Sequence, residues 1–311
     1  MTGSARDGAP PATPHTLIVP APAKVNLFLR VLGRREDGYH DLETLVVPVG
    51  LEDRLHVHAF ADPEVFRSLS VSLELAGDPA RLAGVPLDET NLVLRAAAAL
   101  SEAVGGVRGF AEFVLEKRVP AAAGLGGGSG DAAAALLALN DLWSAGLSDD
   151  RLCEVGAGVG SDVPALLART PVIARGRGER VEPHPVRGFR MVLVPFSFGV
   201  STADAFRWWD EDRAVPGPDP SAALASMSET GPVAGGLVND LEPPVVARHP
   251  EIGAVRDLLV DAGAVLAVMS GSGPTMVGVL PPGNDEIDVE ARAAIEEISG
   301  CAAIETATRL D

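Results

Sequence analysis

The sequence of 311 residues has few cysteines, few positive charges and no long apolar run. Its two cysteines, Cys153 and Cys301, are too far apart for a CxxC motif or for the disulfide framework of a small secreted domain. No apolar run approaches the ~18 residues that a transmembrane helix requires. The amino-terminal residues lack the apolar core of a secretory signal. These absences predict a cytoplasmic protein without a membrane anchor.

Positive charge is scarce, because 25 lysines and arginines face 43 aspartates and glutamates, a net charge of −18. A chain this acidic is poorly suited to holding nucleic acid or lying on an anionic membrane, so we expect neither partner. An anionic small molecule would need a local site built to hold it. Only two of the 25 cations are lysines, Lys24 and Lys117. Either this is chance, or lysine persists where a compact ammonium is needed and a guanidinium will not serve.

The length predicts about two domains, and hydrophobic residues make up 47% of the chain, as in ordinary globular proteins. We expect a flexible tail at 1–15, an N-terminal domain at 16–180 and a C-terminal domain at 181–311. The absence of a regular βαβ repeat favours an α+β fold. Periodicity predicts strands at 16–31, 43–49, 54–60, 68–75, 110–117, 265–269, 275–280 and 302–307. It predicts helices at 91–104, 131–143, 251–262 and 286–298, and a long loop or lid at 215–236.

The strongest motif is the glycine-rich segment 120–130, PAAAGLGGGSG, between a predicted strand and a predicted helix. Glycines let the backbone approach a phosphate closely, and the free N–H groups at a helix start point at it. A flexible turn is the alternative interpretation. Strict G-x-G-x-x-G fails in every frame, and no lysine follows the glycines as the P-loop pattern requires. Phosphate charge would therefore be neutralised by Mg²⁺, by the helix dipole or by a distant basic residue.

Three shorter motifs carry further polar residues. Lys24 and Asn26 alternate on one strand and so share a face. Asp162 precedes Val163-Pro164 and, taken alone, is typical of a helix N-cap. The segment 270–275, SGSGPT, lies between two predicted strands and, taken alone, is typical of a hairpin turn.

Together these segments resemble the GHMP kinase superfamily, small-molecule kinases named for galactose, homoserine, mevalonate and phosphomevalonate. Its three signature regions correspond to PAKVNLFL, PAAAGLGGGSGDAAA and MSGSGPTMVG, in that order. The resemblance covers most of the chain from about Leu17. It implies a two-domain fold, with an N-terminal domain like domain 2 of ribosomal protein S5 and a ferredoxin-like C-terminal domain. It also implies an active site in the cleft between them, and the use of ATP and Mg²⁺.

Longer stretches resemble one branch of that superfamily: PAKVNLFLRVLGRREDGYHDLETL, ETNLVLRAA, KRVPAAAGLGGGSGDAA, GSDVPALL and GLVNDLEPPV. That branch uses ATP to phosphorylate the 2-hydroxyl of a cytidine diphosphate-linked methylerythritol, in the non-mevalonate route to isoprenoid precursors. The resemblance therefore implies this activity and this substrate here.

By the same resemblance, Lys24 and Asp162 occupy the catalytic positions. Asp162 would accept the proton of the substrate hydroxyl, and Lys24 would stabilise the alkoxide as it forms. The substrate-binding positions are those of Asn26 near the hydroxyl, Tyr39 and His40 at the cytosine, and Phe206 at the other face of the ring. The ATP-binding positions are Asn91, Pro120, Ala121, Ala122, Ala123, Gly124, Leu125, Gly126, Gly127, Gly128, Ser129 and Gly130.

Two positions depart from the usual pattern. The pair of hydroxyl residues that usually follows the glycines is Ser129-Gly130 here, and the usual Asp-Asn-Leu is Thr90-Asn91-Leu92. The first departure leaves open how many side chains hold the phosphates. No residue is assigned as a metal ligand, since alternation places His56 and His58 on the solvent face of a strand.

Three other functions remain as alternatives. Another GHMP kinase, acting on homoserine or a mevalonate derivative, is disfavoured by Gly38-Tyr39-His40, because those substrates carry no base to stack. A dinucleotide-binding oxidoreductase is disfavoured by the missing βαβ repeat. A non-catalytic nucleotide-binding relative would be marked by loss of Lys24 or Asp162, and both are present.

Overall fold

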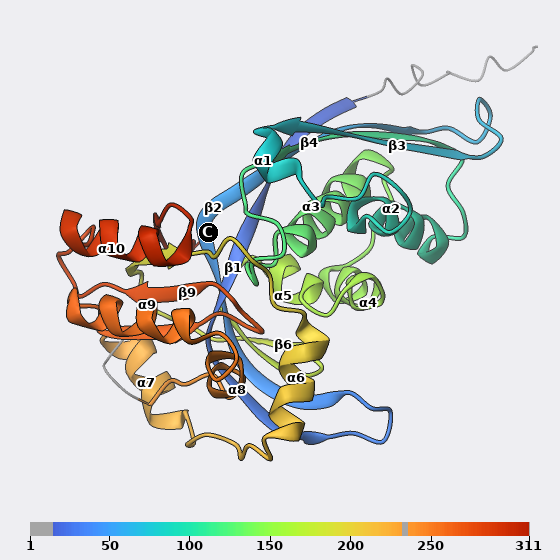
Figure 1. The fold of residues 1–311 in the computed structure, drawn as a ribbon. Coiled ribbons are helices and arrows are strands. Elements are labelled where there is room, and N and C mark those ends of the chain that lie inside the picture. The colour runs from blue at the N-terminus through green and yellow to red at the C-terminus, as the bar shows by residue number, and fades with distance from the viewer. Residues whose placement is uncertain (1–14, 232–235, 311) are drawn as a thin grey trace, which may run out of the picture.

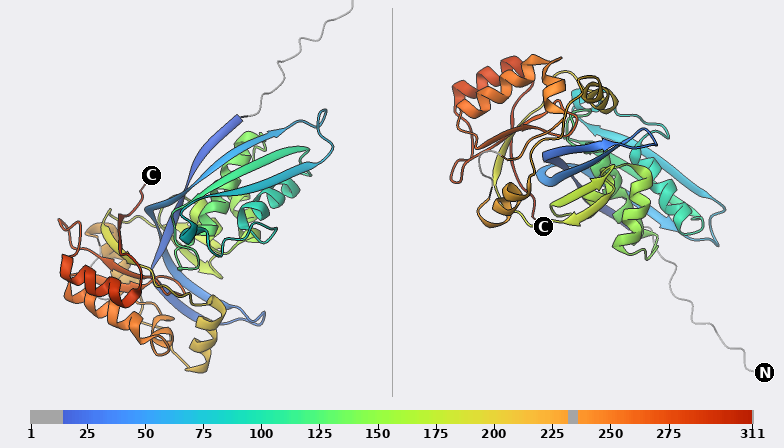
Figure 2. Two further views of the ribbon diagram at one scale, coloured as in Figure 1. Left: turned by 45° about the horizontal axis from the view of Figure 1, so that its top comes forward. Right: turned by 90° about the horizontal axis from the view of Figure 1, so that it is seen from below.

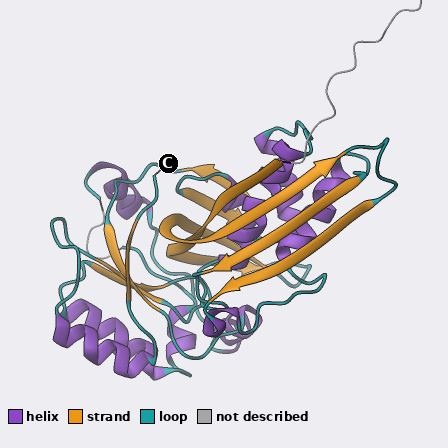
Figure 3. Ribbon diagram, turned by 90° about the horizontal axis from the view of Figure 1, so that it is seen from above, coloured by secondary structure: helices purple, strands orange, loops and turns teal. Residues whose placement is uncertain are grey.

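The computed structural model describes residues 15–231 and 236–310. Residues 1–14 of the expected tail and 232–235 of the expected loop lie outside the described residues. The predicted α+β class is confirmed, because the chain forms two separate sheets with helices packed against each (Figure 3).

The first sheet is organised around two long strands, β1 (His15–Arg34) and β2 (His40–Ala61). They pair antiparallel from His15 opposite Ala59 to Arg34 opposite His40. The other edge of β2 pairs with two shorter strands, one at each end of β2. The prediction of two strands at 43–49 and 54–60 was wrong, because β2 runs through both segments, and Gly50 lies at an irregularity of the ladder without ending the strand.

The remaining strands of this sheet are β3 (Leu69–Gly77), β4 (Gly109–Lys117), β5 (Val172–Gly176) and β6 (Arg180–Pro183). Strand β4 is the partner of the carboxyl-terminal half of β2, and β5 is the partner of its amino-terminal half. Strand β3 runs parallel to β4 at one end of the sheet, and β6 closes the other end beside β5.

One face of this sheet is covered by helices, which bury a core of alanine, leucine and valine (Figure 3). The covering helices are α2 (Leu92–Ala103), α3 (Gly127–Leu142), α4 (Asp149–Val159) and α5 (Val163–Leu167). The short α1 (Pro79–Leu82) follows β3. Helix α3 is almost fully buried, and its run of alanines allows the sheet and the neighbouring helices to approach it closely.

The second sheet is antiparallel, in the order β10-β7-β9-β8. Its strands are β7 (Arg190–Val194), β8 (Leu266–Met269), β9 (Met276–Val279) and β10 (Ile304–Ala307). Helices α9 (Pro250–Asp261) and α10 (Val289–Ser299) pack together against it. Three further helices, α6 (Thr202–Glu211), α7 (Ser221–Glu229) and α8 (Glu242–Val246), precede α9.

We call the first sheet with its helices the first lobe, and the second sheet with its helices the second lobe. The long β1–β2 pair extends from the first lobe into the second (Figures 1 and 2). Its middle residues, among them Val25 and Val47, share a buried cluster with Leu193 of β7 and Val277 of β9. The lobes are therefore joined by an apolar interface as well as by the chain. A domain division at 180/181 stays a prediction.

Two element boundaries differ from expectation. Helix α3 begins at Gly127 and not at residue 131, because Gly126 caps it in a left-handed conformation and Gly127–Gly130 form its first turn. The expected loop 215–236 contains α7, whose Ala223 and Met227 are buried against the shared cluster. Tertiary burial of one face stabilises a helix whose composition alone did not indicate one.

Candidate active site

Lys24 lies between two irregularities of the β1–β2 ladder, at Pro22/Lys24 and at Asn26/Phe28. Such bulges re-aim side chains in a strand. The Lys24 Nζ donates hydrogen bonds to Asn26 Oδ1 (2.8 Å) and to the carbonyl of Gly124 (3.0 Å), and lies 3.2 Å from Asp162 Oδ2. The ammonium thus contacts three separate segments of the chain.

Asp162 precedes α5, but its side chain makes no capping hydrogen bond. The predicted N-cap position of Asp162 is confirmed, but its side chain pairs with Lys24 and does not cap the helix. An ammonium is a stronger, charge-assisted partner than a backbone N–H, and Lys24 provides one. Lys24 is 5% exposed and Asp162 37% exposed, so the carboxylate is the member of the pair that solvent and ligands can reach.

Asn26 is buried, and both ends of its amide are engaged within the protein. Its Oδ1 accepts from Lys24, its Nδ2 donates to Thr44 Oγ1 (2.8 Å), and its backbone N–H donates to Ser270 Oγ (3.1 Å). In this structure Asn26 therefore orients Lys24, and a contact with the substrate hydroxyl stays a prediction. Sequence reasoning missed Thr44, which becomes visible only through the pairing of β1 with β2.

A cavity of about 310 Å³ lies over the glycine segment. The predicted residues 120–129 and Asn91 all line it. Gly126 adopts φ +66°, and a Cβ there would lie 2.8 Å from carbons of the Lys24 side chain. The first N–H groups of α3 have no intrahelical acceptor, and their helix starts at this cavity. The segment thus has the geometry of an anion site.

Two of the predicted ATP-binding residues, Gly130 and Asn91, have other contacts in the structure. Gly130 does not line this cavity; a Cβ there would meet the Pro22 carbonyl oxygen at 2.6 Å, so the backbone of β1 occupies the space of a side chain. Asn91 does line it, but its side chain caps α2 by accepting from Val93 N (2.9 Å) and donates to Pro86 O (2.7 Å).

The turn between β8 and β9 supports the glycine segment from the second lobe. The expected hairpin is confirmed. A Cβ on Gly124 (φ +74°) would lie 2.8 Å from the carbonyl oxygens of both Ser270 and Gly273, so only glycine fits. Thr275 Oγ1 donates to Ala123 O (2.6 Å). Asn239, which sequence reasoning did not single out, donates to the carbonyls of Met269 and Gly271 (both 2.7 Å).

The second lysine, Lys117, lies against the same segment and lines the small cavity together with Asp131. Lys117 Nζ pairs with Asp53 and, at 3.0 Å, with Asp131 Oδ2, and all three side chains are nearly inaccessible. Burial opposes the charge of Lys117, but the two carboxylates raise its pKa overall. Burial raises the pKa of Asp131 to about 8. Asp131 Oδ1 is buried with no hydrogen-bond partner among the described residues.

A larger cavity of about 890 Å³ lies beside Asp162 and brings the predicted base-binding residues together. Tyr39 is 58% exposed, and the guanidinium of Arg177 lies 5.2 Å from its ring centroid. His40 stacks on Phe206, with centroids 4.8 Å apart and ring planes 17° apart. The cavity is lined by Arg34, Gly38, Tyr39, His40, Leu42, Ala157, Gly158, Val159, Gly160, Ser161, Arg177, Thr202, Ala203, Phe206, Arg207, Asp210 and Glu211.

Three of these residues are arginines, which gives an acidic chain a locally basic wall. Arg34 pairs with Asp210, and Arg207 pairs with Asp204 and Glu211. The Arg177 backbone N–H donates to Glu179 Oε2 (2.6 Å), but its guanidinium forms no ion pair with a carboxylate among the described residues. It is therefore the cation of this wall with charge to offer an anionic ligand.

Within residues 15–231 and 236–310 there is no group of three or more His, Cys, Asp or Glu side chains that could hold a metal ion by itself. His58 instead lies 2.9 Å from Glu112 on the neighbouring strand. No helix in that part of the chain is both long and apolar enough to cross a membrane.

Comparison with known proteins agrees with this architecture. Residues 91–169 match the family of GHMP kinases N terminal domains, and residues 219–297 match GHMP kinases C terminal. Homoserine kinase from Cytophaga hutchinsonii superposes with a TM-score of 0.64 over 100% of this chain and 98% of that one. At 17% identity this last likeness shows the fold alone.

Two further proteins are closer in sequence. The chain is 44% identical over 263 residues to the 4-diphosphocytidyl-2-C-methyl-D-erythritol kinase of Symbiobacterium thermophilum, covering 83% of this chain and 89% of that protein. A crystal structure of 4-(cytidine 5'-diphospho)-2C-methyl-D-erythritol kinase is 34% identical, with a TM-score of 0.74 over 95% of this chain and 100% of that one. The two-domain GHMP kinase fold is thus confirmed, and the chain belongs to the 4-diphosphocytidyl-2-C-methyl-D-erythritol kinase family.

Proposed function

We propose that this protein phosphorylates the 2-hydroxyl of 4-diphosphocytidyl-2-C-methyl-D-erythritol with ATP, in the non-mevalonate route to isoprenoid precursors. The observation that carries the proposal is the Lys24–Asp162 pair, whose Nζ and Oδ2 are 3.2 Å apart. Lys24 contacts the glycine segment of the small cavity, and Asp162 directly follows Gly160 and Ser161, which line the large one. The pair therefore lies where a phosphate donor and an alcohol acceptor would meet.

The reaction needs one proton acceptor and one stabilised anion. The acceptor hydroxyl oxygen forms a bond to the γ-phosphorus, the bond to the β,γ-bridging oxygen breaks, and ADP leaves. Asp162 is placed to take the hydroxyl proton, since its carboxylate is accessible and has no capping bond to lose. Lys24 remains beside the reacting oxygen and stabilises its developing negative charge.

The small cavity fits the triphosphate of ATP. Its wall supplies backbone N–H groups at the start of a sixteen-residue helix, the arrangement that binds phosphate in many nucleotide sites. Mg²⁺ fits the same place. It commonly binds through one or two protein oxygens, phosphate oxygens and water. Ser129, which lines this cavity, is the side chain we assign to it, and the ion would neutralise phosphate charge.

The large cavity fits the cytidyl end of the substrate. Tyr39 and Phe206 offer aromatic faces, and base–aromatic stacking contributes roughly 1–3 kcal/mol per base. Arg177, whose guanidinium forms no ion pair within the described part of the chain, suits the diphosphate. Homoserine and mevalonate would leave these groups unused, and family membership does not support those alternatives.

The direct test offers the purified enzyme ATP and Mg²⁺ with the cytidyl substrate, homoserine and mevalonate in turn. Phosphorus NMR of the product should show a new phosphomonoester on the 2-hydroxyl with the cytidyl compound only. The Asp162→Asn variant is the control for enzyme-dependent transfer. Preferential phosphorylation of homoserine or mevalonate would overturn the substrate assignment but not the kinase assignment. The cytoplasm remains the predicted location, and both cysteines are free thiols.

A further inference from the structure

His40 is held by helix α6 as well as by its own strand. It starts β2, opposite Arg34 of β1. Its ring stacks on Phe206 and meets the edge of Trp209, whose centroid is 5.8 Å away. The His40 Nε2 lies 2.9 Å from Asp210 Oδ1, and only 7% of the side chain is exposed. The ring therefore has one orientation, fixed by three residues of α6.

Asp210 determines which nitrogen of that ring carries the proton. A carboxylate only accepts hydrogen bonds, so the Nε2 facing it must be the N–H donor. The other Asp210 oxygen lies 3.5 Å from Arg34 Nη1, so the carboxylate is held between His40 and Arg34. In the Nε2–H tautomer the ring has a bare lone pair on Nδ1. Within the described residues nothing bonds to Nδ1, and His40 lines the large cavity.

We propose that Asp210 is a specificity-positioning residue, which fixes the tautomer of His40 so that Nδ1 selects cytosine over uracil. The inference rests on the proposed function, because it assumes that a pyrimidine occupies the large cavity. Cytosine presents a 4-amino donor, which a bare Nδ1 accepts. Uracil presents a 4-carbonyl acceptor, like thymine, and would place two lone pairs against each other. Asp210 acts through His40 and need not touch the substrate.

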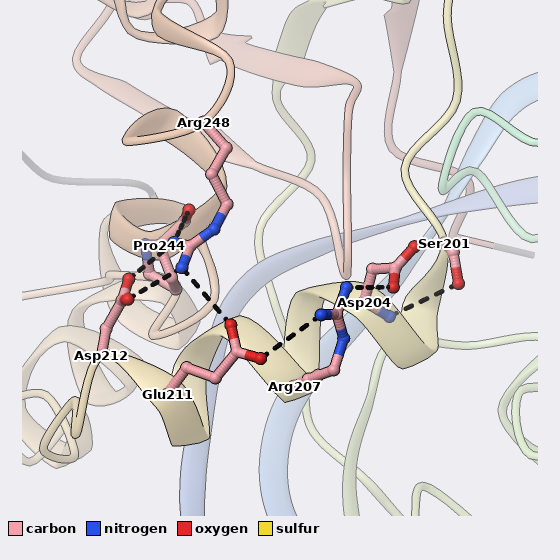
Figure 4. A network of polar contacts seen from close by, with 7 residues as sticks. All are labelled: Ser201, Asp204, Arg207, Glu211, Asp212, Pro244 and Arg248. Carbon is pink, nitrogen blue, oxygen red and sulfur yellow. Dashed lines mark hydrogen bonds and ion pairs between the residues drawn. The ribbon is translucent and has the colours of Figure 1, made fainter.

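The other acidic side chains near this end of α6 point elsewhere. Figure 4 shows that Asp204 and Glu211 engage Arg207, and that Glu211 and Asp212 engage Arg248. Arg248 also donates to the Pro244 carbonyl (2.9 Å), which ties α6 to α8. Asp210 is outside this network and is directed at His40 and Arg34. Asp212 is therefore a matched control, a carboxylate two residues away that does not contact His40.

The first experiment measures kcat/KM for the cytidyl substrate and for its uridyl analogue. An amide can accept from Nε2 or donate to it, so Asp210→Asn no longer imposes one tautomer. We expect the cytidyl-to-uridyl preference to fall about tenfold, the value of one hydrogen bond, with KM for ATP unchanged. Asp212→Asn should keep the wild-type preference. An unchanged preference in Asp210→Asn would overturn the proposal.

The second experiment reads the tautomer without any substrate. Nitrogen-15 NMR of the histidine rings, with His40 assigned by comparison with His40→Gln, should show a protonated Nε2 and a bare Nδ1 in the wild type. Asp210→Asn should shift His40 toward a mixture of tautomers, and Asp212→Asn should not. A wild-type His40 that already exchanges between tautomers would overturn the inference. If His40 shows the expected tautomer but the enzyme phosphorylates neither the cytidyl nor the uridyl substrate, the proposed function is refuted.

Discussion

The chain has two lysines, and both lie against the glycine segment. Lys24 faces the partly exposed carboxylate of Asp162 and two neutral acceptors. Lys117 faces two carboxylates, Asp53 and Asp131, that are essentially inaccessible. A Cβ on Gly127 would come within 3.3 Å of Lys117 Nζ, just as one on Gly126 would strike the Lys24 side chain. The two lysines thus contact the same segment in different environments. Lys24 pairs with a carboxylate that solvent can reach, and Lys117 pairs with carboxylates that are buried.

The difference between these settings separates catalysis from stability. A charge that solvent and ligands can reach acts on a reaction at little cost to folding, because water can still stabilise it. A buried charge must be matched inside the protein, and removing its partner is expensive. We therefore expect changes around Lys24 to affect turnover, and changes around Lys117 to affect unfolding.

The largest effect is expected for Asp162→Asn, the partner of Lys24. The amide keeps the size of the carboxylate but cannot take the hydroxyl proton, and loss of a general base typically lowers kcat about 10²- to 10⁴-fold. Steady-state kinetics and ATP binding by calorimetry check this, with binding and melting temperature expected to stay near wild type. Near-wild-type kcat would show that Asp162 has no role in proton transfer.

The matching change at the buried lysine is Lys117→Met, which keeps the apolar stem of the side chain and removes the ammonium. Asp53 and Asp131 are then buried without a counter-charge, and we expect a loss of about 3–5 kcal/mol in the free energy of unfolding. Urea denaturation measures this loss. If Lys117→Met unfolds like wild type but loses turnover, the contrast between the two lysines is contradicted, because Lys117 would then also act on the reaction.

A smaller effect with a defined pH dependence is expected for Asp131→Asn. Burial raises the pKa of Asp131 to about 8 in the folded protein, against 3.8 for an ordinary aspartate. Between those values the folded state binds more protons than the unfolded state, so this group's stabilising contribution is complete below pH 3.8 and is lost as pH rises through 8.

The neutral amide removes that dependence. Relative to wild type, Asp131→Asn should therefore gain stability as pH rises from 5 to 9, by about 1–3 kcal/mol, the desolvation cost of one buried group. Urea midpoints at several pH values measure the trend. A relative stability that stays constant between pH 5 and 9 would show that Asp131 is ionised and well paired throughout.

The smallest effect is expected for Tyr39→Ala in the large cavity, away from both lysines. Loss of roughly 1–3 kcal/mol of stacking should raise KM for the cytidyl substrate about 5- to 150-fold and leave KM for ATP unchanged. Tyr39→Phe should be mild, because stacking needs the ring and not the hydroxyl. A Tyr39→Ala protein that melts early yet binds the cytidyl compound normally would assign Tyr39 a structural role only.

Much of the site was predictable from local sequence, because local geometry determines it. Lys24 and Asn26 share a strand face through the period of two, and glycines before a helix present free N–H groups to a phosphate. The exact start of α3 was not predictable. It depends on the left-handed conformation of Gly126, which is favoured where the Lys24 side chain leaves no room for a Cβ.

Other features depended on contacts between distant segments, and local patterns carry no signal for these. The sequence placed Asp162 at a helix start, but the partner of its side chain, Lys24, lies 138 positions away in the sequence. Asn239 supports the β8–β9 turn, and Asp210 reaches His40 across 170 positions. The lysine scarcity was visible at once, but only the fold brings Asp53 and Asp131 to Lys117. Sequence alone therefore determined which chemistry the chain carries, and tertiary structure decided which charges are sealed and which can react, because burial and distant partners set the cost of each charge.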